Sequence, residues 1–263
     1  ASDVYKRQFL FVSCSVKHKK TFDYIFNKTE AITLEQSKLT LSKDITVLSF
    51  SDSSMVDRNS SIIKVDSGWI VYSKNSESSI LSFTSDGQFS GYIGHRGNGP
   101  GEYTSVYDVV VNQKSKVLEV LSDGGIFCYT FGGDFLDKKE VTYPAFSFAI
   151  DDRQNYWFYV GNNTTYGDAK MICTDENIAN VAYYLHQKSN MLPMVENNFG
   201  RNGEWLTFHE SLNHDLYTIE NGKLDLSYAM DFPNYKLPKK LHELSGMEVI
   251  EELQRSNYAS IIN

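Results

Sequence analysis

The sequence is poor in the residues that mark several protein classes. Its 263 residues include 3 Cys, 5 Pro and 17 Gly. No CxxC pair or Cys/His spacing typical of a zinc site is present. Gly and Pro are too few for a collagen-like or low-complexity chain. What remains is a globular chain, whose 41% hydrophobic content suffices for one large domain or two small ones.

Sequence signatures of common enzyme classes are also missing. His209, Glu210 and His214 form HExxxH instead of HExxH, and this spacing does not bring both His residues to one helical face. No GxSxG motif occurs. The Gly-rich segment 94–101 lacks the Gly-Lys-Ser/Thr of a phosphate loop. We therefore predict no catalytic residue, no metal site and no cofactor from motifs.

The first residues require separate interpretation. Their apolar run is far shorter than the ~20 residues that a membrane-spanning helix needs, so such a helix is not expected here. Residues 1–8 contain SDVYKRQ, which resembles the translation of a sequencing adapter, and we interpret them as a scar. Residues 9–14 resemble the tail of a bacterial lipoprotein signal peptide, although Phe11 and Val12 depart from the strict pattern. Cys14 is then the predicted lipidation site; an ordinary apolar strand is the alternative. Residues 15–44 are interpreted as a tether and leading strand segment.

Positive charge is in deficit, with a net charge of −8 and a pI near 5.3. An acidic chain repels phosphate backbones, so nucleic acid is not an expected partner. Aromatic residues are abundant, with 17 Tyr and 16 Phe. Because flat rings pack well on pleated surfaces, this composition favours strands.

A repeat of 46 residues organises the middle of the chain. Four residues recur at this offset (126 − 80 = 46): Ile80, Phe83, Gly87 and Phe89 return as Ile126, Tyr129, Gly133 and Phe135. A fixed period of this size, built from short strands and Gly turns, is typical of a β-propeller. The predicted fold is therefore all-β.

Apolar runs separated by Asp-Gly, Gly-Gly and Asn-Gly turns predict successive blades. The first covers 62–93, the second 106–140, the third 146–185 and the fourth 204–230. Helical spacing of apolar residues predicts a helix within 238–255. Residues 45–263 hold about 4.8 repeats. We therefore expect a propeller of the six-bladed type that is incomplete at its C-terminus, with four to five blades present; a closed five-bladed ring is the alternative.

Two segments carry a family resemblance. Residues 62–89 are similar to an NHL repeat, with Ser73 where many such repeats carry Asp. Residues 92–103, YIGHRGNGPGEY, look like the six-bladed β-propeller family of Bacteroidetes lipoproteins. The resemblance implies a six-bladed ring, export and a lipid anchor at Cys14 in the outer membrane or periplasm. It implies no enzymatic activity.

The Gly-rich segment supplies one set of candidate ligand-binding residues: His95, Arg96, Glu102 and Tyr103. One interpretation is that these side chains fix the loop to the next blade, since charges in rigid loops usually serve local geometry. The other is a ligand-facing rim.

An aromatic group supplies the second set: Tyr156, Trp157, Tyr159, Asn162 and Tyr166. Aromatic faces stack on sugars or apolar groups, and amides orient them. The alternative is that alternate members pack between blades. Tyr143 and Phe146 belong to the same group.

The sequence therefore predicts a non-catalytic binding or interaction module whose ligand is a protein, peptide or glycan. Its contact with a membrane is expected only through a lipid anchor at Cys14. A metal-dependent hydrolase of the lactonase kind, with a metal in the propeller channel, is the alternative function. Cys128 and Cys173 are interpreted as buried free thiols, although a disulfide remains open at this point.

Overall fold

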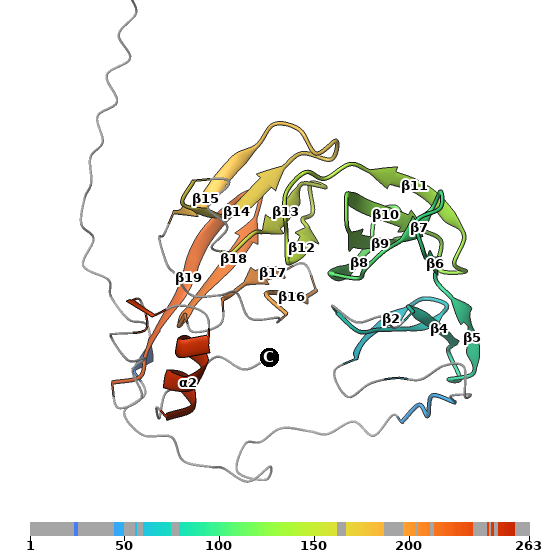
Figure 1. Cartoon of the computed structure of the whole chain (residues 1–263), viewed down its shortest axis with the longest axis horizontal. Helices are drawn as coiled ribbons and strands as arrows, with labels where there is room; N and C mark the ends of the chain where they lie inside the picture. Colours follow the sequence, from blue (N-terminus) through green and yellow to red (C-terminus); the bar gives the residue numbers. More distant parts are fainter. Residues whose placement is uncertain are drawn as a thin grey trace, which may run out of the picture.

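Most of the strands belong to four sheets that stand side by side around a common centre, as the blades of a propeller do (Figure 1). The computed structural model describes residues 24–25, 45–49, 56, 60–74, 79–161, 167–186, 197–203, 205–210, 213–233, 241, 243–244 and 247–255. The predicted all-β propeller is confirmed, and the described residues contain four blades in an open arc.

Each blade is an antiparallel meander that runs from the centre outward. Blade 1 contains β2 (Ser61–Val65), β3 (Gly68–Tyr72), β4 (Leu81–Thr84) and β5 (Phe89–Tyr92). Blade 2 contains β8 (Asp108–Asn112), β9 (Val117–Ser122), β10 (Gly125–Tyr129) and β11 (Phe135–Lys139). Blade 3 contains β12 (Ser147–Ile150), β13 (Tyr156–Tyr159), β14 (Ala169–Thr174) and β15 (Ala182–His186). Blade 4 contains β16 (Phe199–Asn202), β17 (Trp205–Phe208), β18 (Asp215–Glu220) and β19 (Lys223–Asp231).

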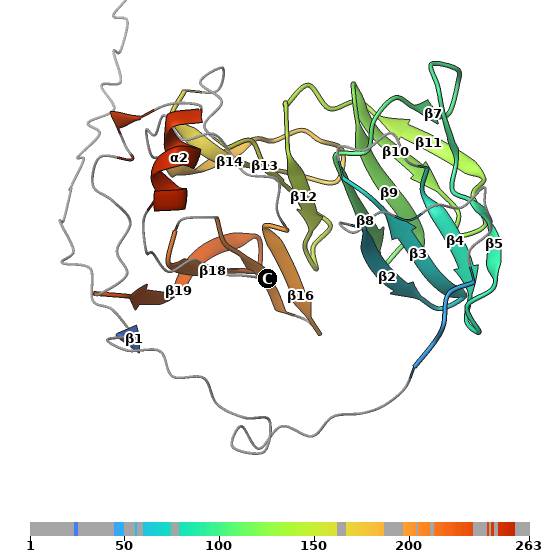
Figure 2. The ribbon, with the colours of Figure 1, turned by 60° about the horizontal axis from the view of Figure 1, so that its bottom comes forward.

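Three smaller features complete the described fold. Strand β1 (Tyr24–Ile25) pairs in parallel with the end of β19, at the outer edge of blade 4 (Figure 2). Strands β6 (His95–Arg96) and β7 (Glu102–Tyr103) form a short parallel pair between blades 1 and 2. Helix α2 (Met247–Arg255) lies within the range in which a helix was predicted. Within the described part of the chain, no helix has both the length and the apolar character to cross a bilayer.

The 46-residue repeat corresponds to equivalent hairpins in blades 1 and 2. Both hairpins carry a register shift at the same repeat position, between Ser82 and Phe83 in one and between Cys128 and Tyr129 in the other. Their turns also match, because Thr84 N bonds Gln88 O at 2.8 Å, and Thr130 N bonds Asp134 O at 2.9 Å. The repeat therefore preserves backbone geometry as well as residue type.

Gly87 shows why this turn requires glycine. Its φ of +88° lies in the region that side chains disfavour, and a Cβ would lie 2.1 Å from the carbonyl oxygen of Val47. The segment 45–49 runs beside this turn, with Ser49 N bonded to Gly87 O at 2.8 Å. The turn therefore reverses the direction of the chain and also contacts segment 45–49 of the same chain.

The core lies between the blades, because alternate residues of a strand face opposite blades. In β13, Tyr156 and Phe158 pack towards blade 2, whereas Trp157 and Tyr159 pack towards blade 4. Central strands such as β10 and β14 are therefore buried along their whole length. Outer strand β11 is mostly exposed.

Cys128 and Cys173 occupy the third strands of blades 2 and 3. Both thiols are free and buried, as predicted from their strand-like surroundings. Burial raises the pKa of each thiol to about 12. These cysteines are therefore packing residues in the thiol form.

The fourth blade differs from the sequence prediction in its first strand. The expected first strand, within 204–209, is the second strand β17, and β16 (Phe199–Asn202) precedes it at the centre. The sequence FGRN has no apolar alternation, so its strand character arises from pairing with β17 and not from its own pattern.

Candidate functional site

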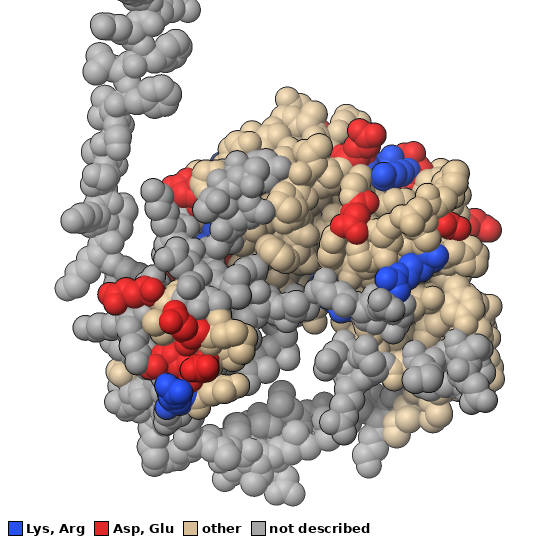
Figure 3. Space-filling model, viewed as in Figure 1, with Lys and Arg blue, Asp and Glu red and all other residues tan. Residues whose placement is uncertain are grey.

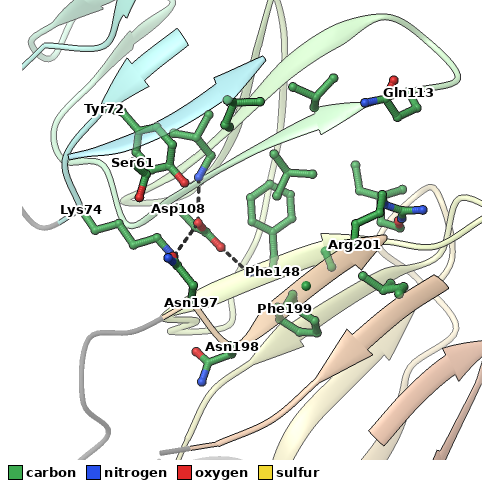
Figure 4. Close-up of a pocket in the computed structure, with 18 of the residues that line it drawn as sticks. Ser61, Tyr72, Lys74, Asp108, Gln113, Phe148, Asn197, Asn198, Phe199 and Arg201 are labelled. Carbon is green, nitrogen blue, oxygen red and sulfur yellow. Dashed lines mark hydrogen bonds and ion pairs between the residues drawn. The ribbon is translucent and has the colours of Figure 1, made fainter. Parts of the chain in front are cut away.

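The inner strands of the four blades surround a pocket of about 460 Å³ at the centre of the arc (Figure 4). We call this the channel pocket. Apolar side chains of β2, β8 and β12 form part of its wall, and polar side chains reach it from blades 1, 2 and 4. Its labelled residues in Figure 4 are Ser61, Tyr72, Lys74, Asp108, Gln113, Phe148, Asn197, Asn198, Phe199 and Arg201.

Polar residues stand where the inner strands begin. Strands β2, β8 and β12 start at Ser61, Asp108 and Ser147, and Asn198 directly precedes β16. These positions share one end of the channel because the inner strands are equivalent elements of the repeat. The fold thereby gathers four polar residues that are far apart in the sequence.

Asp108 forms the most buried charged contact of the pocket. Lys74 Nζ lies 2.8 Å from Asp108 Oδ1, and the two side chains are only 10% and 8% exposed. Burial raises the pKa of Asp108, while the Lys74 ammonium acts against that rise. Removing one partner of a buried pair leaves an uncompensated charge and costs about 3–5 kcal/mol. The pair is therefore a fixed part of the pocket wall.

The Asp108 carboxylate also joins three blades. Its Oδ1 accepts from Val109 N at 3.0 Å, and its Oδ2 accepts from Phe148 N of blade 3 at 3.0 Å. Lys74 follows the second strand of blade 1. A single carboxylate thus holds the inner edges of blades 1, 2 and 3 in register.

Asn198 makes the corresponding connection between blades 3 and 4. Ser147 Oγ donates to Asn198 Oδ1 at 2.8 Å. Asn198 Nδ2 donates to His209 O at 3.2 Å, and His209 N donates to Asn198 O at 3.0 Å. Burial lowers the pKa of His209, whose Nε2 has no hydrogen-bond partner among the described residues. The wall of the pocket on this side therefore relies on neutral hydrogen bonds.

Arg201 leaves a positive charge in the pocket. Its guanidinium donates to the carbonyl oxygen of Ile150, while the side chain as a whole is exposed. No carboxylate of the described residues lies within ion-pair distance of it. Asp151, near the same wall, already accepts from Arg153 N at 2.9 Å and Trp157 Nε1 at 3.0 Å. The Lys74–Asp108 pair is neutral as a unit. The net charge of the side chains that line the pocket is therefore positive and comes from Arg201.

The predicted residues of the Gly-rich loop lie elsewhere, at the junction of blades 1 and 2. His95 and Arg96 are exposed on β6, which pairs with Glu102 and Tyr103 on β7. Arg96 Nε donates to Thr104 O at 2.9 Å. The structure thus brings these four predicted residues together.

Glu102 and Tyr103 bond to backbone groups. Glu102 Oε2 accepts from Gly99 N at 2.8 Å. The Tyr103 hydroxyl donates to Ile93 O and accepts from Ile80 N, both at 3.2 Å, and the side chain is fully buried. Burial is also the main reason for the raised pKa of this phenol. These contacts brace the loop.

The predicted aromatic residues of β13 are divided between the two faces of blade 3. Trp157 Nε1 donates to Asp151 Oδ2 at 3.0 Å, and the Tyr159 hydroxyl donates to Glu210 Oε1 at 2.9 Å. Both side chains are buried between blades 3 and 4. Asn162 and Tyr166 lie outside the described residues, as does Cys14.

Among the predicted β13 residues, Tyr156 borders a cavity of about 620 Å³ between blades 2 and 3. Its hydroxyl donates to Glu119 Oε2 at 2.8 Å, and Asn112 Nδ2 donates to Glu119 Oε1 at 3.0 Å. Lys139 Nζ lies 4.7 Å from the centre of the Tyr156 ring. Both carboxylate oxygens of Glu119 therefore have partners within the protein.

The His209-Glu210 sequence is part of a buried network. Lys170 Nζ lies 3.0 Å from Glu210 Oε1, and both residues are buried. Among the described residues, no three His, Cys, Asp or Glu side chains are grouped closely enough to hold a metal ion.

The polar residues of the channel pocket were not among the predicted site residues. Lys74, Asp108, Asn198 and Arg201 belong to no local motif and come from three different blades. A signal was nevertheless present, because Asp108 and Ser147 open the first strand of their repeats. Superimposing the repeats from inner strand to inner strand would have selected Asp108, but not Lys74 or Arg201, which do not open an inner strand.

The sequence matches a known family over residues 47–263. The chain belongs to the DUF4934 family. Its description is a domain of unknown function, so membership assigns no activity. No protein of curated function matches this DUF4934 chain.

Solved structures share the fold of this DUF4934 domain. A Bacteroides fragilis protein classed as exported is 16% identical, with a TM-score of 0.74 over 89% of this chain and 68% of that one. A DUF4221 family member from Bacteroides vulgatus is 12% identical, with a TM-score of 0.51 over 75% and 66%. A streptogramin B lyase reaches a TM-score of only 0.46 at 18% identity, over 73% and 59%. The lyase likeness is too weak to bear on activity, and the chain spans about two thirds of the length of the first two structures.

Proposed function

We propose that this DUF4934 chain is a non-catalytic binding module of the cell envelope, and that its ligand, a segment of a protein, peptide or glycan, enters the channel pocket. The observation that supports the proposal most directly is the convergence of polar side chains from three blades on one pocket. Two of them, Lys74 and Asp108, neutralise each other, and Arg201 remains exposed without a carboxylate partner among the described residues. A cavity with convergent polar groups on a rigid scaffold is suited to binding.

The size of the pocket fits this role. Its volume of about 460 Å³ lies within the range of small-ligand sites, roughly 300–1,000 Å³. Ile62, Val110 and Phe148 supply apolar surface, while Gln113 and Asn197 supply exposed amides. Apolar walls provide affinity and amides provide orientation. This mixture suits an extended segment of a peptide or glycan.

Envelope localisation is proposed on two grounds. One is the resemblance of residues 9–14 to a lipoprotein signal, with Cys14 as the lipidated residue. The other is the fold shared with an exported Bacteroides fragilis protein. A six-bladed ring is proposed from residues 92–103.

Nucleic acid is not proposed as the ligand. The net charge is −8, and on the face drawn in Figure 3 the described Lys and Arg side chains are scattered. Acidic side chains gather over α2, which carries Glu248, Glu251 and Glu252. Such a surface repels a phosphate backbone.

Array binding with two matched variants tests the proposal. Ile62 on inner strand β2 lines the channel pocket, and Leu226 lies on outer strand β19; both are exposed apolar strand residues. The wild-type chain is applied to peptide and glycan arrays, and each captured probe is measured by titration calorimetry. Ile62→Trp narrows the pocket and is expected to weaken binding roughly tenfold, whereas Leu226→Trp leaves it unchanged. Capture of no probe, or equal effects of the two variants, would contradict the proposal.

A further inference from the structure

A third cavity, of about 640 Å³, lies between blades 2 and 3 where β11 connects to β12. We call this the junction cavity. One wall is the β9–β10 turn with Asp123 and Gly124, and the other is the connection 141–146. Tyr107, which directly precedes Asp108 of the channel pocket, also lines the cavity, and its backbone N–H donates to Leu121 O of β9 at 2.9 Å.

The junction cavity has a single formally charged lining residue, Asp123. Three hydroxyl groups donate to its carboxylate: Tyr107 OH at 2.5 Å, Thr104 Oγ1 at 2.7 Å and Ser105 Oγ at 2.8 Å. These bonds hold the pKa of Asp123 below its usual range, so the group is ionised and fixed in orientation. Hydroxyl donors carry no charge, and the negative charge therefore persists.

No described lining residue of the junction cavity is a cation, and the nearby Lys138 Nζ, 3.5 Å from where a Cβ on Gly124 would lie, is directed over the Phe127 ring at 5.1 Å. The described lining residues include no Lys, Arg or His. Nor do they include Asn or Gln, the amides that commonly orient sugar hydroxyls. The absence of both kinds of side chain from this lining favours a cationic ligand over a neutral sugar.

Aromatic rings supply the remainder of the surface. Tyr107 and Tyr143 are half-buried, and Phe146 is 41% exposed. The Tyr143 ring lies 5.7 Å from that of Phe158 in the core, and Phe146 N bonds Tyr159 O at 2.9 Å. The rings are thus carried by a firmly held backbone while Phe146 still presents its side chain to solvent. Aromatic faces attract guanidinium and ammonium groups.

We propose that the junction cavity binds an arginine side chain presented by a peptide or protein partner. Asp123 Oδ1, which accepts one hydroxyl whereas Oδ2 accepts two, would receive a guanidinium N–H, and the aromatic rings would pack against the planar guanidinium and its methylene stem. A guanidinium suits this combination because it donates in a plane and stacks on rings. The cavity of about 640 Å³ exceeds one side chain, so the adjoining peptide backbone fits as well.

The test uses the full chain and three short probes: acetyl-Gly-Arg-Gly-amide, the same peptide with neutral citrulline for arginine, and a neutral methyl galactoside. Binding is followed by ligand-observed NMR titration. The arginine peptide is expected to bind roughly tenfold more tightly than the citrulline peptide. Its affinity is expected to fall as NaCl rises from about 20 to about 300 mM, because the contact is charged and near the surface.

Three variants locate the contact. Asp123→Asn is expected to remove the preference for arginine over citrulline, and Phe146→Ala to weaken the arginine peptide severalfold. Asp134→Asn is the matched control, since Asp134 is also an exposed turn carboxylate bonded to a hydroxyl, that of Thr130 at 3.3 Å. It is expected to change nothing. Phe146 is exposed and its truncation spares the core, so this variant reports on binding even where Asp123→Asn alters folding.

Several results would overturn the proposal. Equal affinity for the arginine and citrulline peptides would show that the protein does not recognise the charge of the guanidinium. Equal effects of Asp123→Asn and Asp134→Asn would show that the arginine peptide does not bind at Asp123. Failure of the arginine peptide to bind at any concentration tested, with binding of the galactoside in a Phe146-dependent manner, would reassign the cavity to a sugar. These results are independent of the channel pocket, which Ile62→Trp tests separately.

Discussion

The Gly-rich loop at 94–103 and the channel pocket differ in how they use their polar groups. In the loop, Arg96, Glu102 and Tyr103 bond to backbone atoms within or beside the loop. In the channel pocket, Arg201 and Gln113 are exposed towards a cavity. The Gly-rich loop was predicted as a candidate binding site from its sequence, but its contacts with backbone atoms make it a structural brace between blades. Binding capacity follows from polar groups that the fold leaves available.

The glycines of the loop explain its rigidity. Gly94 has a φ of +61°, and a Cβ there would lie 2.5 Å from the Tyr129 ring. A Cβ at Gly101 would lie 2.6 Å from the Phe135 ring. Both rings belong to blade 2, so the loop from blade 1 is pressed against its neighbour. The Tyr129 hydroxyl completes the contact by donating to Gly101 O at 2.9 Å.

The largest expected effect on stability comes from adding a Cβ at Gly94, where the loop contacts the Tyr129 ring. Gly94 and Gly203 share a φ of +61°, but a Cβ at Gly203 meets nothing within 4 Å. Gly203→Ala is expected to cost about 1–2 kcal/mol of unfolding free energy for the left-handed backbone. Gly94→Ala is expected to cost about 1–3 kcal/mol more, because the ring of Tyr129 must move. Urea denaturation measures both, and equal losses would show that the loop is not tightly packed.

An intermediate effect concerns pH on the channel side. Burial lowers the pKa of His209 below its usual 6.5, so the unfolded chain takes up a proton before the folded chain does. Stability is therefore expected to be lost as the pH falls from 6.5 towards the folded pKa of His209. His209→Gln removes this contribution. Thermal melting of both proteins from about pH 7 to pH 5 measures the difference; parallel curves would mean that His209 titrates normally.

The smallest expected effect on stability is at Arg201. Arg201→Gln removes an exposed guanidinium bonded to one backbone carbonyl, and the unfolding free energy is expected to change by less than about 0.5 kcal/mol. Arg153→Gln is the matched control, because Arg153 is exposed and bonds Asn221 Oδ1 at 3.1 Å. Chemical denaturation checks both. A loss above about 1 kcal/mol for Arg201→Gln alone would make Arg201 a brace and weaken the contrast with the loop.

The sequence predicted the blades well because their signals are local. Strand residues, Asp-Gly turns and the 46-residue offset all lie within one hairpin, and hairpin register follows from turn geometry. Inner strand β16 was not predicted, because Phe199–Asn202 has no alternation of apolar and polar residues. Its strand conformation depends on pairing with β17, the next strand of the same hairpin, and not on its own residue pattern.

The candidate site was less predictable because its residues meet only in the tertiary structure. Tyr156, Trp157 and Tyr159 were predicted together because they are adjacent in the chain, but a strand sends neighbours to opposite faces. Tyr156 reaches one cavity while the other two pack against blade 4. Lys74 and Asp108, which do share a pocket, are separated by a whole hairpin and the loop.

The sequence by itself determined the all-β class, the hairpin repeat and the burial of both blade cysteines, since these follow from local periodicity, turn chemistry and composition. The tertiary structure alone decided which polar groups meet. Asp108 contacts blades 1 and 3 only because inner strands from distant repeats converge on one axis. The position of Asp108 in its repeat can be read from the sequence, but its partners cannot, because the local environment of a residue does not record which distant residue it will contact.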